Sequence, residues 1–305
     1  MTVAPTVSEL EPPAPAVPVI TIEGLSKKFG SLWAVRDLTL TIPNGAVFGL
    51  IGPNGAGKST TFSVLATLLQ PTGGRVRVAG FDPVTQPLDV RRHLGYMPDV
   101  MGVYDNLAVD EYLQFFAAAY RVPRKRWPPL VDDLLELVDL TDKKRSLVDS
   151  LSRGMKQRLS LARSLVHDPA VLVLDEPASG LDPRARVELR QLVGQLSDMG
   201  KTIVISSHIL AELEEMCSHV AILEAGSLLA TGRPKELFRT VTSARQMRVR
   251  ISGQPDRLLT VADDEEQHAV LRRLVVDDGL TVLEYAEEVG SLESAFMEIT
   301  KGIVQ

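Results

Sequence analysis

The chain has 305 residues with a formal net charge of −6, and 45% of them are hydrophobic and 24% charged. This length and composition predict one large or two globular domains with enough apolar material for a core, and the acidic balance argues against a nucleic-acid partner bound through overall basic charge. The single cysteine, Cys217, excludes a disulfide within the chain and indicates a reducing cytosol, and no apolar run has the roughly 18–20 residues that span a bilayer.

The N-terminal segment predicts a disordered extension over residues 1–18, because its prolines and glutamates cannot build a core. It also lacks the basic start and apolar centre of a secretory signal, so any membrane role would come through a partner. A strand is predicted to begin at residues 19–22, followed by a turn over Leu25–Gly30. A second strand is predicted over Trp33–Ile42, with alternating apolar residues.

The next stretch carries the strongest motif of the chain. The apolar run Val47–Ile51 predicts a buried strand, and Ser59–Leu69 has the apolar spacing of a helix, with Leu68 on its apolar side. Between them, residues 52–59 fit G-x-x-x-x-G-K-[ST], the phosphate-binding loop, in the strand–loop–helix context that this motif requires. The predicted nucleotide-binding residues are Gly52, Pro53, Asn54, Gly55, Ala56, Gly57, Lys58, Ser59 and Thr60.

The residue types of this loop explain its chemistry. Glycines allow backbone angles that turn successive N–H groups toward one anion at a helix N-terminus. Lys58 adds a positive charge for the β- and γ-phosphates of ATP, and Ser59 adds a hydroxyl for Mg²⁺.

Downstream, short strands are predicted at Arg75–Gly80 and His93–Met97, followed by a helical insertion over residues 107–147 that prolines divide in two. A helix should then run through Leu165. Later elements are a strand over Ala170–Leu174, a helix over Pro183–Met199, a strand over Thr202–Ser206 and a hairpin of Val220–Glu224 with Ser227–Thr231.

Two of these strands end in residues suited to ATP hydrolysis. Asp175 closes an apolar strand, which suits a carboxylate that helps to hold Mg²⁺, and Glu176 beside it could be the base that activates water. His208 follows the next strand and could contact the γ-phosphate. Taken alone, His208 would be interpreted as a histidine without function at a strand end.

The composition changes near residue 243, and residues 243–305 predict a small accessory α/β domain without a chemical motif. Its expected elements are a strand over Met247–Ser252, a helix over Gln267–Val276, a strand over Thr281–Ala286 and a helix over Leu292–Thr300. The acidic run Asp263–Glu266 is expected to be a solvated loop.

The order of these segments resembles the ATP-binding cassette (ABC) family over residues 19–242, with a helical subdomain at about 99–160. Residues 151–158, LSRGMKQR, are similar to the LSGGQ signature of this family. Ser152 and Gly154 match the signature, whereas Arg153 and Met155 depart from it. In this family two cassettes pair head-to-tail, so the resemblance implies that Ser152, Arg153 and Gly154 face the γ-phosphate bound by the other cassette.

The resemblance assigns three further positions. Phe29 takes the place of the aromatic residue that stacks on the base. Residues 179–182, SGLD, look like the D-loop of the family, which joins the two ATP sites, and Asp182 ends this segment. Asp99 stands where the family usually has a glutamine. That glutamine links Mg²⁺ and the attacking water to the transmembrane partner. Aspartate also offers an oxygen, but it is charged and one methylene shorter.

The sequence therefore predicts an α/β P-loop ABC cassette with a helical subdomain and a C-terminal domain. The implied function is the ATP-hydrolysing subunit of an exporter, at the inner face of the cell membrane, with ATP and Mg²⁺ as cofactors. The implied partners are a separate transmembrane permease and a second copy or paralogous cassette, with no nucleic acid. The sequence leaves the cargo open.

Two alternatives to the exporter remain at this point. A soluble ABC ATPase that acts as a mechanical or regulatory module usually has tandem cassettes or a long coiled coil, whereas this chain has one cassette and no sustained heptads. An ATP-binding switch with weak hydrolysis is opposed by Glu176 and His208, but Asp99 keeps it open.

Overall fold

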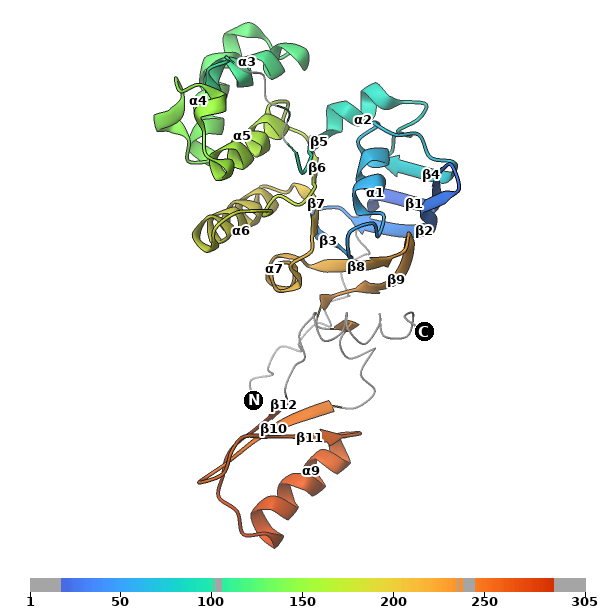
Figure 1. The fold of residues 1–305 in the computed structure, drawn as a ribbon, viewed down its shortest axis with the longest axis vertical. Coiled ribbons are helices and arrows are strands. Elements are labelled where there is room, and N and C mark those ends of the chain that lie inside the picture. Colours follow the sequence, from blue (N-terminus) through green and yellow to red (C-terminus); the bar gives the residue numbers. More distant parts are fainter. Residues whose placement is uncertain (1–17, 101, 103–105, 235, 238–244, 288–305) are drawn as a thin grey trace, which may run out of the picture.

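The structure is a computed structural model that describes residues 18–100, 102, 106–234, 236–237 and 245–287. A six-stranded sheet in the order β5-β6-β7-β3-β8-β9 forms its centre (Figure 1). Five of its strands are parallel, and β9 pairs antiparallel with β8, which confirms the predicted hairpin. The strands are β3 (Val47–Ile51), β5 (Leu94–Met97), β6 (Val171–Leu174), β7 (Thr202–Ser207), β8 (His219–Glu224) and β9 (Ser227–Gly232).

A second, antiparallel sheet in the order β2-β1-β4 consists of β1 (Pro18–Phe29), β2 (Leu32–Pro43) and β4 (Gly73–Val78). The turn predicted over Leu25–Gly30 is wrong, because β1 continues to Phe29, which pairs with Leu32. Gly24 explains the continuation: its φ of +62° permits an irregularity in the strand, after which Leu25 is again fully buried.

The helices next to these sheets are α1 (Lys58–Leu65), α2 (Pro87–His93), α6 (Pro183–Asp198) and α7 (Leu210–Met216). The helix predicted to reach Leu69 ends at Leu65, and Leu68 is 63% exposed rather than packed. Thr67 has a φ of +63°, a left-handed conformation that cannot continue an α-helix. Two helices of seven residues each, α2 and α7, were not predicted from the sequence.

A helical part lies beside the central sheet and contains α3 (Val109–Ala119), α4 (Trp127–Leu137) and α5 (Arg153–Leu165) (Figure 1). This confirms the predicted helical insertion. The predicted division in two is also confirmed: Pro123 lies between α3 and α4, and Pro128 and Pro129 stand in the first turn of α4. Proline suits that position, since the first N–H groups of a helix have no partner within the helix.

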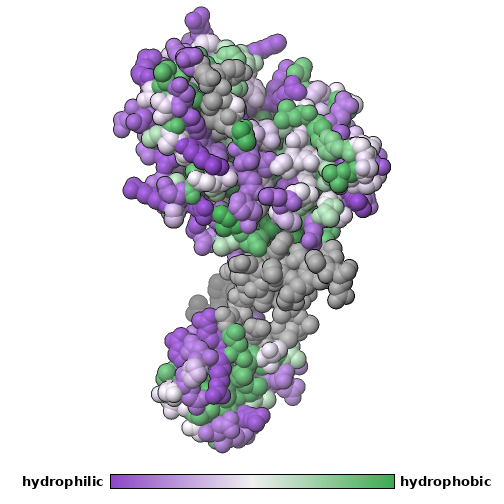
Figure 2. Space-filling view, viewed as in Figure 1, coloured by the Kyte–Doolittle hydropathy of each residue, from purple (hydrophilic) through white to green (hydrophobic). Residues whose placement is uncertain are grey.

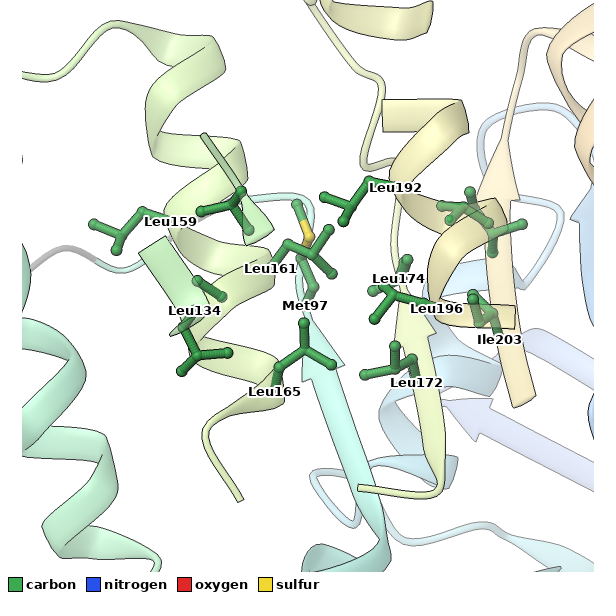
Figure 3. Close-up of a cluster of buried hydrophobic side chains, with 14 of the residues drawn as sticks. Met97, Leu134, Leu159, Leu161, Leu165, Leu172, Leu174, Leu192, Leu196 and Ile203 are labelled. Atoms are coloured by element: carbon green, nitrogen blue, oxygen red, sulfur yellow. The ribbon is translucent and has the colours of Figure 1, made fainter. Parts of the chain in front are cut away.

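The central sheet is covered by apolar side chains on both faces. Val171 and Val173 of β6 pack toward the core shared with α1 and the β2-β1-β4 sheet. Leu172 and Leu174 point the other way, into the core shared with α4, α5 and α6 (Figure 3). This alternation fixes the register of β6 and so the position of the residues that follow it.

The C-terminal residues form a separate antiparallel sheet in the order β11-β10-β12 with one helix. Its elements are β10 (Arg245–Ile251), β11 (Arg257–Val261), α9 (Asp264–Arg272), a π-helical turn (Arg273–Asp277) and β12 (Val282–Glu287). The solvated loop predicted over Asp263–Glu266 is wrong: Asp263 caps α9 by accepting a hydrogen bond from the N–H of Glu266 at 2.8 Å. Acidic side chains in the first helical turn are favourable there.

Two predictions concern residues outside the described ranges: the N-terminal extension up to residue 17 and the helix over Leu292–Thr300. The sequence analysis also missed β11. Within the described ranges, no helix combines the length and the apolar character needed to cross a bilayer.

Candidate functional site

The phosphate loop joins β3 to α1 and is held tightly against its neighbours. Gly57, the N-terminal cap of α1, has a φ of +102°, and a Cβ there would lie 2.6 Å from the carbonyl oxygen of Ala34. A Cβ at Gly52 would lie 2.3 Å from the carbonyl oxygen of Leu223. Any side chain at these two positions would displace the backbone, so glycine is required for the loop geometry.

Lys58 is nearly buried, with 6% of its surface exposed. Its Nζ donates to the carbonyl oxygen of Gly52 at 2.6 Å and lies 3.5 Å from Oε1 of Glu176. An ammonium group held at this depth is the positive charge that a polyphosphate entering the loop would meet.

Asp175 and Glu176 follow β6 at the carboxyl end of the parallel sheet, where ligands of such sheets bind. Ser206, on the neighbouring strand β7, connects the two residues. Its Oγ donates to Oδ1 of Asp175 at 2.7 Å and accepts from the N–H of Glu176 at 2.8 Å. Ser206 was not predicted to position these residues, although its place near the end of a buried strand was a signal in the sequence.

The carboxylate of Glu176 lies between two cationic or potentially cationic groups. Its Oε2 is 2.7 Å from Nδ1 of His208, and Oε1 faces Lys58. Glu176 itself has a φ of +48°, an uncommon backbone conformation for a residue with a side chain. Such a conformation persists only where the surroundings impose it, and it often marks functional sites.

The cleft around the loop and the hollow beside it contain further residues that were predicted from the sequence. Phe29 is 48% exposed and lines the cleft together with Trp33, which the sequence analysis missed. Asp99 and Glu176 line this cleft and also the adjoining hollow, to which Ser179 and His208 contribute. Most of the expected site residues therefore come together here, namely Phe29, residues 53–60 of the phosphate loop, Asp99, Glu176 and His208.

Burial raises the pKa of the Asp175 carboxyl above its ordinary value. Hydrogen bonds from Ser206 and Ser59 lower it, whereas the charges of Glu176 and Asp99 raise it further. Three carboxylates thus lie within electrostatic reach of one another, an arrangement that a bound cation would stabilise.

We expect Asp175→Asn to raise the melting temperature of the nucleotide-free protein at neutral pH. A raised pKa means that the folded state binds the proton more tightly than the unfolded chain, so ionised Asp175 opposes folding and the cost grows as pH rises. Asparagine is uncharged, and its oxygen still accepts from Ser206. Calorimetry without nucleotide should show a gain at neutral pH that shrinks as the pH falls toward 3.8, the ordinary pKa of the carboxyl. A gain independent of pH, or a loss, would contradict this account.

The signature-like segment lies elsewhere. Ser152 caps α5, and its Oγ accepts from the N–H of Met155 at 3.3 Å. Ser152 and Arg153 are exposed, and among the described residues that line the phosphate-loop cleft none comes from positions 152–154. Asp182 caps α6 by accepting from the N–H of Ala185 at 2.9 Å.

A parallel sheet with a phosphate loop after its central strand β3, and with carboxylates at the ends of neighbouring strands, defines a P-loop ATPase. Known proteins agree with this class and narrow it. The family described as ABC transporter matches residues 35–179. The Nod factor export ATP-binding protein I of Ralstonia nicotianae is 33% identical to this chain, over 95% of this chain and 97% of that protein.

Two further comparisons point the same way. The bacitracin transport ATP-binding protein BcrA from Bacillus licheniformis is 33% identical, over 93% of this chain and 98% of its own. A solved structure of an ATP-binding subunit of an ABC transporter superposes with a TM-score of 0.67 at 30% identity, covering 73% of this chain and 92% of its own. The chain belongs to the ABC transporter family, as an ATP-binding, ATP-hydrolysing subunit of the exporter type.

Proposed function

We propose that this ATPase subunit works as a head-to-tail dimer, with a second copy or a paralogous cassette. One observation carries the proposal: the loop and Glu176 line one cleft and His208 lines the hollow that adjoins it, whereas the signature residues Ser152 and Gly154 are not among the described residues that line either. Pairing two chains head-to-tail would bring the N-terminus of each α5 to the other chain's ATP. A helix N-terminus with free N–H groups suits a γ-phosphate.

Mg²⁺ fits the residues of the cleft. Ser59 and Asp175 supply a hydroxyl and a carboxylate, and Asp99 supplies a second carboxylate nearby. Among the described residues no group of three His, Cys, Asp or Glu side chains could hold a metal by itself. This matches Mg²⁺, which is usually held by one or two carboxylates together with substrate phosphates and water. When bound, the ion would neutralise charge on the phosphate oxygens.

The protein side chains divide the remaining work. Lys58 would leave its contact with Gly52 and bind the β- and γ-phosphates. Glu176 would accept a proton from the attacking water, and His208 would hold the Glu176 carboxylate in place through Nδ1. The other ring nitrogen of His208, Nε2, is then the atom available to a γ-phosphate oxygen. Phe29 would stack on the base.

The permease partner would hold this subunit at the inner face of the cell membrane. A groove between the core and the helical part, lined by Leu68, Tyr96, Phe116, Tyr120 and Arg163, offers a surface for it. Figure 2 shows hydrophobic residues gathered near α1 and β4. Leu68, in the segment between these two elements, is exposed. Exposed apolar residues beside a groove are typical of a protein–protein contact.

The dimer is tested by the dependence of ATPase activity on protein concentration. If each site needs residues of a second chain, the rate per subunit should rise with concentration in dilute solution and then level off. Omitting Mg²⁺ should remove the activity. A specific activity that stays constant over a thousandfold dilution would contradict the shared site.

Asp99 is the residue of the proposed metal site at which this chain differs from the usual glutamine of the family. We expect Asp99→Ala to weaken the Mg²⁺ dependence of the ATPase and its stimulation by the permease, because an oxygen near the ion is lost. Asp99→Gln should retain much of both. The assay is a Mg²⁺ titration with and without the permease. If Asp99→Ala follows the wild-type curves, Asp99 is only a turn residue.

We also propose that residues 243–305 form an accessory domain that ATP binding does not require. β10, β11, β12 and α9 contribute no residue to the described lining of the cleft. A chain truncated after Arg239 should therefore fold and bind ATP with an affinity within about threefold of the full chain, measured by calorimetric titration. A folded truncation that fails to bind would refute this division.

A further inference from the structure

Arg153 makes a contact that the family resemblance does not foresee. It is the first residue of α5, between Ser152 and Gly154. A Cβ added to Gly180 would lie 2.4 Å from Cζ of Arg153. The guanidinium of Arg153 therefore lies directly on this glycine. One guanidinium nitrogen donates to Oγ of Ser179 at 3.3 Å. The start of the signature helix is therefore in contact with the D-loop of its own chain.

A second contact joins the same two segments. A Cβ at Gly154 would lie 3.5 Å from Cδ2 of Leu181, an ordinary packing distance to a side chain that is only 8% exposed. Ser179 and Leu181, the residues on either side of Gly180, therefore both face the first turn of α5.

The D-loop connects this contact to the catalytic residues. The N–H of Ser179 donates to the carbonyl oxygen of Glu176 at 2.9 Å, and Ser179 lines the same hollow as Glu176 and His208. Beyond Gly180, the carbonyl oxygen of Leu181 accepts from Arg186 at 3.1 Å, and Asp182 caps α6. A short hydrogen-bonded segment therefore connects the guanidinium of Arg153 with Glu176.

We propose that Arg153 is a positioning residue that couples the two ATP sites of the dimer. This inference rests on the proposed head-to-tail arrangement, in which Ser152 and Gly154 contact the partner's ATP. If contact with the partner's ATP shifts the N-terminus of α5, Arg153 would transmit the shift to Gly180 and Ser179. Through Ser179 the shift would reach Glu176, in the ATP site of the same chain as Arg153. The glycine that the family usually has at this position carries no side chain for such a contact.

The residue types on both sides suit this role. A planar guanidinium can lie flat against a residue without a Cβ and still donate to a neighbouring hydroxyl, which an ammonium group cannot reproduce. Gly180 has a φ of +70° in addition to the close contact, so only glycine fits both requirements. The contact is exposed, and exposed polar contacts contribute little to stability, so variants at Arg153 should still fold.

The coupling is tested by the ATP-concentration dependence of hydrolysis in the full-length dimer. The wild type should be cooperative, with a Hill coefficient approaching two, the number of sites, and Arg153→Ala should lower it to about 1. Arg153→Lys should not restore cooperativity, and Gly180→Ala should reduce it as Arg153→Ala does. Arg184→Ala, which removes another exposed guanidinium next to the D-loop, is the matched control and should behave as the wild type.

A second arm separates coupling from direct phosphate contact and from failure of the dimer itself. Glu176→Gln should form an ATP-dependent dimer in size-exclusion chromatography, both alone and together with Arg153→Ala. No dimer in either variant would overturn the head-to-tail site and this inference with it. Loss of the dimer only in the double variant would make Arg153 a phosphate contact. If the dimers form but Arg153→Ala has the same Hill coefficient for hydrolysis as the wild type, the coupling is overturned and the head-to-tail site stands.

Discussion

Lys58→Ala is expected to lower the affinity for ATP by roughly 10²-fold, because hydrogen bonds to charged groups contribute about 1.5–3 kcal/mol and we propose that this side chain donates to the β- and γ-phosphates. Lys58 is nearly buried at the base of the loop, and its Nζ lies 2.6 Å from the carbonyl oxygen of Gly52. Calorimetric titration with ATP and Mg²⁺ measures the loss directly.

The control for this substitution is Lys28→Ala. Lys28 carries the same charge near the rim of the cleft, where its Nζ lies 5.0 Å from the centroid of the Trp33 ring. If the local positive charge alone attracted ATP, both variants would lose similar affinity, whereas a specific phosphate contact predicts a loss confined to Lys58. An unchanged affinity and turnover in Lys58→Ala would overturn the assignment of the loop.

The phosphate loop could be predicted from sequence because its constraints fall on consecutive residues. Glycines, a lysine and a hydroxyl residue must appear at fixed spacing between a strand and a helix, and residues 52–59 meet every condition. The convergence of Asp99, Asp175 and His208 could also be anticipated. Each follows a strand of one parallel sheet, and the carboxyl ends of such strands share an edge.

Features that depend on distant partners could not be predicted in this way. Ser206 gains its role from Asp175 and Glu176, some 30 residues earlier, and the contact of Arg153 with Gly180 joins the start of α5 to the loop before α6. The course of β1 past Gly24 depends on its pairing with β2, so local turn signals gave the wrong answer. The acidic residues 263–266 were misread because a helix cap and a solvated loop share the same composition.

Glu176→Gln is expected to keep ATP binding while slowing hydrolysis by roughly 10²–10⁴-fold, the usual contribution of a general base. Glutamine has nearly the same shape, so it can preserve the contact with His208, whose Nδ1 lies 2.7 Å from Oε2 in the native protein. It cannot accept a proton from water at neutral pH. The substitution therefore separates the chemical step from the binding step.

The slowed enzyme should accumulate as a dimer, because an intact γ-phosphate would stay between the loop of one chain and the signature residues of the other. Size-exclusion chromatography with ATP and Mg²⁺ should show a shift from monomer to dimer that ADP does not produce. Glu188→Gln is the matched control: it alters a carboxylate on α6 that pairs with Arg158, outside the cleft, so turnover should stay within a few-fold of the wild type and no dimer should be trapped. A Glu176→Gln protein that remains monomeric at high concentration, or that hydrolyses ATP at the native rate, would show that Glu176 is not the base of a site shared between two chains.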